Sequence, residues 1–227
     1  MDNNKIGQHI SEQFNNELKD IHNNLLTMGG LVERQLEMTI QAIETGDREL
    51  AEQVIKKEHQ VETLEKTIDH ECMQTLALRQ PTAYDLRLLI TVIKIINELE
   101  SINKKAGWIA EITLKSIGSR SSFSHYELEH LTVLVKGMLH DALNAFARLS
   151  LENVSGIMER EANVDREYEN VLRRLNTRMM EDPRNITRSL EVLETVRALE
   201  RIGDHACYIC EHLFYMIKGE YVRLADQ

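Results

Sequence analysis

The stretch VRALERIGDHACYICE, residues 196–211, has a counterpart 100 residues earlier, INELESINKKAGWIAE, residues 96–111. A second, longer pair lies upstream of these. Residues 30–62, GLVERQLEMTIQAIETGDRELAEQVIKKEHQVE, align without a gap with residues 133–165, VLVKGMLHDALNAFARLSLENVSGIMEREANVD, at a constant shift of 103. Self-similarity at a fixed spacing indicates two copies of one structural unit.

We therefore predict two domains of the same plan, at residues 1–118 and 119–227. The shift changes from 103 to 100 near Pro81 and Pro183. Prolines are typical of turns between helices. The second copy is therefore three residues shorter in a connection, and the corresponding helices keep their lengths.

Apolar residues recur every three or four positions in both copies, which is the period of an amphipathic helix. The chain has only two prolines and ten glycines, and aromatic residues make up 5% of it. A fold of many short strands would need more turn residues than this. We predict an all-α protein of two tandem three-helix bundles. The expected helices span residues 9–45, 47–78 and 82–117 in the first half, and 124–151, 153–180 and 183–218 in the second.

Capping residues mark most of the predicted helix ends. Glycine can adopt the left-handed conformation that ends a helix, and Asp, Ser or Thr can accept a hydrogen bond from a free amide at the next helix start. The spacing of a hydroxyl and an acid three residues apart is that of a capping box. The predicted caps are Gly46 with Asp47, Thr82 with Asp85, Ser124 with Glu127, Asp182 before Pro183, and the stops Gly118 and Gly219.

The composition excludes several classes of partner and location. With 37 acids against 27 bases, the net charge is −10, which repels nucleic acid, anionic lipid and free phosphate. The longest apolar run is interrupted by Arg87 and Lys94 and is far too short to span a membrane. No secretory signal is visible, and three cysteines do not form a disulfide framework. We expect a cytoplasmic protein without direct membrane insertion, whose membrane association, if any, runs through protein partners.

Two pairs of acids are candidates for a metal site. Glu200 and Asp204 are four residues apart and so share one helix face, and Glu161 and Asp165 repeat this spacing on the preceding helix. If the two faces meet, four carboxylates converge, and a cation would relieve their repulsion. Oxygen ligands suit magnesium, manganese, calcium or iron.

Other motifs favour a structural interpretation. Cys207 and Cys210 form a C-x-x-C inside a helix, without the βαβ context of a redox motif. We interpret His205 and His212 as polar neighbours of the core. The stretch ELEH, residues 127–130, is a single E-x-x-H where a di-iron bundle needs two. No phosphate-binding loop, nucleophile elbow or H-E-x-x-H is present in the sequence, so we predict that the protein is not an enzyme.

The motif LERIGDHA at residues 199–206, the E-x-x-x-D on the preceding helix and the two similar halves resemble the PhoU family. The resemblance covers almost the whole chain. It implies a homodimeric cytoplasmic regulator that couples the ATPase subunit of a phosphate ABC transporter to a sensor histidine kinase and restrains the phosphate-starvation response. It also implies metal ions, such as iron, zinc, manganese or magnesium, held by E(D)-x-x-x-D motifs, which fall here on Glu161, Asp165, Glu200 and Asp204.

The first half departs from this pattern. Its copy of the motif reads LESINK, with Glu100 retained and Lys104 in place of the aspartate, and its partner pair is Glu58 and Glu62. A lysine among three acids can supply by ion pairing the charge that a metal would supply. We therefore expect weak or no metal binding in the first half. Two alternatives to the regulatory adaptor stay open at this stage: a metal-dependent helix-bundle enzyme, and a metal-buffering protein.

Overall fold

The prediction of an all-helical protein is confirmed. The computed structural model describes residues 12–117 and 128–221, and within these ranges it contains no β-strand. The first half holds α1 (Glu12–Thr45), α2 (Arg48–Leu78) and α3 (Ala83–Ser116). The second half holds α4 (Glu129–Arg148), α5 (Val154–Glu181) and α6 (Ile186–Lys218), with a short 3-10 turn, η2 (Pro183–Asn185), before α6.

Most of the predicted caps are present. Asp47 accepts a hydrogen bond from the Leu50 amide at 3.1 Å, and Gly46 adopts a φ of 65° just before it. Thr82 and Asp85 form the expected capping box at the start of α3. The last helix ends at Gly219, which has a φ of 78°. Gly118, Ser124 and Glu127 lie outside the described residues.

Three helix boundaries differ from the sequence prediction. The first is the start of α4, which begins at Glu129 and not at the predicted residue 124. Asp182 caps η2, accepting from the Arg184 amide at 3.0 Å, so α6 begins three residues later than expected. In addition, α4 ends at Arg148, because Leu149 adopts a left-handed φ of 48°. This conformation is costly for a residue other than glycine. Two interactions offset this conformational cost. The Ser150 amide donates a hydrogen bond to the Ala145 carbonyl at 3.0 Å, and the Leu149 side chain packs against the core.

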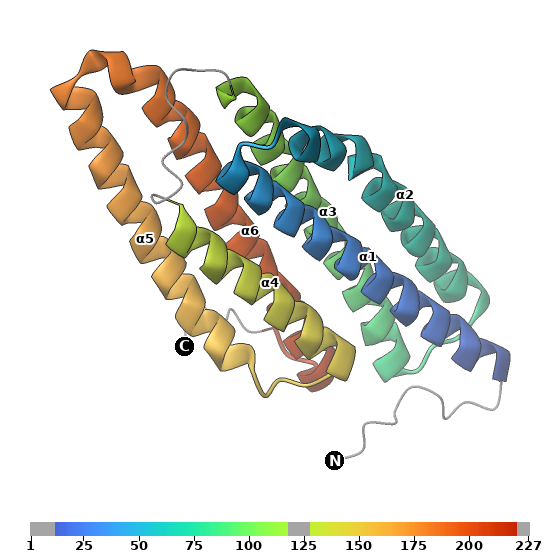
Figure 1. The fold of residues 1–227 in the computed structure, drawn as a ribbon. Helices are drawn as coiled ribbons and strands as arrows, with labels where there is room; N and C mark the ends of the chain where they lie inside the picture. The colour runs from blue at the N-terminus through green and yellow to red at the C-terminus, as the bar shows by residue number, and fades with distance from the viewer. Residues whose placement is uncertain (1–11, 118–127, 222–227) are drawn as a thin grey trace.

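The two halves pack side by side, with α2 and α5 on the outer edges and α1 and α4 in contact (Figure 1). Contacts between α1 and α4 reveal the symmetry. Glu33 contacts His140 at 2.6 Å, and Glu37 contacts Lys136 at 2.7 Å. At the repeat shift of 103, Glu33 corresponds to Lys136 and Glu37 corresponds to His140. The shift therefore converts each contact into the other, with the two helices exchanged. This exchange is what an approximate two-fold axis between two antiparallel helices produces.

The apolar core is continuous across both halves. One cluster of buried side chains includes residues from all six α-helices. Phe146 of α4 is fully buried and stacks on His22 of α1, with ring centroids 5.2 Å apart. Burial lowers the pKa of His22, which keeps the imidazole neutral. The halves therefore share one core, whatever their origin as repeats.

A polar contact joins the two long central helices. Glu98 of α3 accepts hydrogen bonds from His205 at 2.6 Å and His212 at 3.4 Å, both on α6. Burial alone would raise the pKa of Glu98, but these two hydrogen bonds outweigh it and lower the pKa to about 2. The two histidines are thus partners of a half-buried carboxylate between the halves. Ala198 occupies the repeat position equivalent to Glu98.

Substitutions at two adjacent glycines of α1, Gly29 and Gly30, can test how closely α1 approaches α4. A Cβ on Gly29 would lie 2.6 Å from Leu143 of α4, whereas a Cβ on Gly30 would meet nothing within 4 Å. We expect Gly29→Leu to destabilise the protein by about 1–3 kcal/mol through overpacking. Gly30→Ala should instead stabilise it by about 0.5–1 kcal/mol through helix propensity. Urea unfolding measures both, and equal effects of the two changes would contradict the close approach of α1 and α4.

Candidate metal centre

The four predicted acids lie on the packed pair α5 and α6. Burial raises the pKa of Glu161, and the charges of Asp165 and Asp204 raise it further. Burial likewise raises the pKa of Glu200, and the charge of Asp204 adds to the effect. Carboxylates affect one another in this way when they are near neighbours, so the two pairs lie on adjoining parts of the packed helices α5 and α6.

An arginine supplies a positive charge to this cluster. Arg201 contacts Asp204 at 3.1 Å and Glu200 at 3.7 Å. Its side chain is 60% exposed, so the ion pairs are screened by solvent and contribute little to stability. A cation therefore lies beside the acids of the second half, as Lys104 lies beside those of the first.

The side chains do not form a coordination shell as they are arranged. Within residues 12–117 and 128–221, no three His, Cys, Asp or Glu side chains are placed to hold a metal ion. The donor set nevertheless suits a hard or borderline cation, since it consists of four carboxylates. Burial and mutual repulsion raise the pKa values of Glu161, Glu200 and Asp204. The metal site at these four acids stays a prediction.

Two more side chains face the acids, and the sequence analysis did not assign them to the site. The thiol of Cys207 lies beside Glu161 and lowers the pKa of that carboxyl, whereas the charge of Glu211 raises it. A signal for Glu211 existed in the repeat, where it aligns with Glu111 at the shift of 100. No signal pointed to Cys207, since it aligns with Gly107.

In the first half, lysines lie beside the equivalent acids, Glu58, Glu62 and Glu100. Lys104 contacts Glu100 at 2.6 Å, and Lys66 contacts Glu62 at 2.6 Å. Glu58 fills the space beside Gly107, where an added Cβ would lie 2.7 Å from its carboxylate oxygen. Burial and the charge of Glu111 raise the pKa of Glu58. Two lysines therefore form ion pairs with this acidic group, and weak metal binding in the first half stays a prediction.

The cysteines are buried and free of disulfides. Burial raises the pKa of Cys72 and of Cys210 to about 12, and it raises that of Cys207 as well. A thiol that stays protonated at neutral pH is a poor nucleophile. This agrees with the interpretation of the C-x-x-C as packing.

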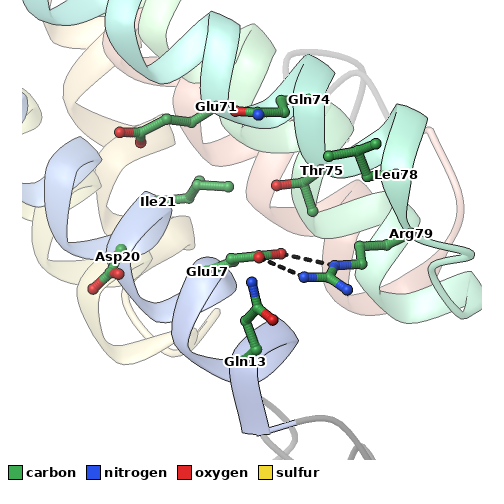
Figure 2. A pocket seen from close by; sticks show the side chains of 9 residues that line it. All are labelled: Gln13, Glu17, Asp20, Ile21, Glu71, Gln74, Thr75, Leu78 and Arg79. Carbon is green, nitrogen blue, oxygen red and sulfur yellow. Dashed lines mark hydrogen bonds and ion pairs between the residues drawn. The ribbon is translucent and has the colours of Figure 1, made fainter.

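A separate hollow of about 300 Å³ lies between the end of α2 and the start of α1 (Figure 2). Its one guanidinium, Arg79, forms a two-pronged ion pair with Glu17, at 2.7 and 3.1 Å. Asp20 and Glu71 also line the hollow. With its cation already paired and further acids around it, this hollow is unsuited to phosphate or any other anion.

No helix in the described part of the chain is both long and apolar enough to cross a membrane.

A family model described as the PhoU domain matches residues 25–113 and 128–213. The chain is 44% identical over 223 residues to the phosphate-specific transport system accessory protein PhoU of Serratia marcescens, covering 98% of this chain and 92% of that protein. It is 42% identical over 220 residues to the protein of the same name in Escherichia coli K12, covering 97% of this chain and 91% of that protein.

Solved structures show the same fold. The crystal structure of PhoU from Pseudomonas aeruginosa superposes with a TM-score of 0.88 at 41% identity, covering 92% of this chain and all (100%) of that one. The phosphate transport system regulatory protein PhoU from Streptococcus pneumoniae superposes with a TM-score of 0.86 at 28% identity, covering 93% of this chain and 100% of that one.

Proposed function

Because the chain belongs to the PhoU family, we propose that it is a non-enzymatic regulator of phosphate uptake and signalling in the cytoplasm. It acts as an adaptor between the ATPase subunit of a phosphate ABC transporter and a sensor histidine kinase, and it restrains the phosphate-starvation response when phosphate is plentiful. The observation that carries this proposal is the similarity over nearly the full chain, at 42–44% identity, to accessory proteins of phosphate-specific transport.

The electrostatics of the protein support a role through partners. The net charge of −10 disfavours free phosphate as a direct ligand, and the hollow between α1 and α2 has no free cation for it. A regulator of phosphate uptake with these properties would respond to phosphate through the transporter and the kinase. A homodimer would present each binding surface twice.

Glu161, Asp165, Glu200 and Asp204 are the residues that would hold a metal ion, either iron, zinc, manganese or magnesium. The raised pKa values of Glu161, Glu200 and Asp204 support this assignment, because a bound cation lowers the free energy of neighbouring ionised carboxylates. The role of the ion would be structural, holding α5 against α6. Metal binding would require Arg201 to leave Asp204, which its exposure permits.

A deletion strain tests the regulatory function. With the gene removed and phosphate abundant, we expect phosphate-starvation genes to be expressed constitutively, because the restraint on the kinase is lost. A transcriptional reporter measures this, and re-expression of the intact chain should restore repression. Unchanged repression in the deletion strain would rule out the proposed role.

A further inference from the structure

The turn between α5 and α6 carries an unusual charge for this acidic protein. Residues 170–190 contain five arginines, no lysine and two acids, although the whole chain has a net charge of −10. We call this region the arginine tip. It lies at the opposite end of the molecule from the turn between α2 and α3 (Figure 1). Its five basic residues are Arg173, Arg174, Arg178, Arg184 and Arg188.

Large apolar side chains are exposed among these arginines. Met180 at the end of α5 is 85% exposed, and Ile186 and Leu190 on the first turns of α6 are 42% and 47% exposed. Ile186 and Leu190 are four residues apart and share one helix face. The arginine tip therefore combines positive charge with an apolar surface, and methionine adapts easily to apolar groups of different shape.

The internal repeat provides a matched comparison. The equivalent turn between α2 and α3 also exposes apolar side chains, with Leu78 at 70% and Leu86 at 39%. That turn, residues 67–90, carries three acids and only two arginines. Both arginines are engaged within the chain, Arg79 with Glu17 and Arg87 with the Met216 carbonyl. Exposed apolar residues are thus common to both turns, while the excess of arginine belongs to the second half alone.

Two ion pairs of the arginine tip are largely exposed and therefore weak, whereas a third joins Arg174 to the partly buried Glu167 at 3.0 Å. Arg173 contacts Glu169 at 3.6 Å with both side chains at least 70% exposed, and Arg184 contacts Asp182 at 3.0 Å with the arginine 91% exposed. Exposed pairs of this kind contribute about 0–1 kcal/mol. Carboxylates of a partner can replace them at little cost, and the planar guanidinium binds a carboxylate through two hydrogen bonds.

From this combination we propose that the arginine tip is a docking surface for an acidic, amphipathic segment of a protein partner. Acidic side chains of that segment pair with the arginines, and its apolar side chains cover Met180, Ile186 and Leu190. Charge complementarity selects a protein segment over an anionic membrane, because the rest of this acidic chain would be repelled by anionic lipid. The inference rests on the proposed function, in which the partners are the transporter's ATPase subunit and the sensor kinase.

Binding measurements with the full chain test the docking surface. The probes are the purified ATPase subunit, the cytoplasmic part of the kinase, and vesicles containing anionic phosphatidylglycerol. There are two test proteins, each a double variant. One carries Arg173→Glu and Arg184→Glu, and the other carries Met180→Ser and Leu190→Ser. The controls are Arg48→Glu, whose side chain is 62% exposed in a similar pair with Glu52, and Leu78→Ser on the opposite turn. Circular dichroism verifies that each variant is folded.

We expect both test variants to weaken binding to one of the two proteins by about tenfold or more, as truncation or reversal of central contacts does. The double arginine variant should also reduce the salt dependence of the dissociation constant. The controls should bind as the unmodified chain does. Equal binding by all variants would overturn the docking surface and leave the adaptor function intact. Binding of neither protein by the unmodified chain would overturn both, and arginine-dependent binding to the vesicles would assign the surface to lipid instead.

Discussion

Replacing Asp204 with lysine is expected to remove bound metal from the purified protein. The change places an ammonium group among Glu161, Asp165 and Glu200, which reproduces the arrangement of the first half, where Lys104 pairs with Glu100 at 2.6 Å. A fixed positive charge competes with a cation for the same carboxylates, and one oxygen ligand is lost as well. Elemental analysis of the purified protein should show the metal content falling close to zero.

The reciprocal change, Lys104→Asp, should add metal to the first half. It adds a fourth acid beside Glu58, Glu62 and Glu100 and removes the lysine that pairs with Glu100. Lys66 remains paired with Glu62 at the exposed edge of the group. Glu181→Lys, at an exposed acid of α5 outside the cluster, is the control for a charge change alone and should leave the metal content unchanged. If the Asp204→Lys protein retains the metal content of the unmodified chain, the assignment of the four acids is wrong.

Phe146→Ala is expected to produce the largest loss of stability. This side chain is fully buried in the core that both halves share, and it stacks on His22 of α1. Removing a buried phenylalanine ring costs about 3–5 kcal/mol, because transfer free energy is lost and a cavity remains. For a chain of this size, such a loss lowers Tm by roughly 10 °C.

The same variant tests whether the halves unfold together. Since Phe146 contacts both halves, we expect calorimetry to show one transition that moves as a whole. Phe146→Leu keeps most of the apolar volume and should cost much less. Two separate transitions, only one of them shifted, would show that the halves are independent folding units despite their continuous core.

Local chemistry made the helices predictable. The three- and four-residue spacing of apolar side chains, Gly46 with Asp47, and the capping box of Thr82 with Asp85 act within one or two helical turns. The repeat then gave two bundles of the same plan. Local rules did not predict the end of α4 at Leu149, because its left-handed backbone is stabilised by core packing and by a hydrogen bond that closes only in the folded turn.

The candidate metal site likewise depends partly on local sequence and partly on tertiary contacts. The sequence by itself determined that Glu161 and Asp165 share one helix face and that Glu200 and Asp204 share another, because a helix places residues four apart side by side. Only the tertiary structure decided that the charges of Asp165 and Asp204 both act on Glu161 and that Cys207 lies beside it. It also decided that Glu98 pairs with His205 across the two halves. These contacts join residues far apart in the chain, and their free energy depends on burial and on charges from other helices, which no local pattern specifies.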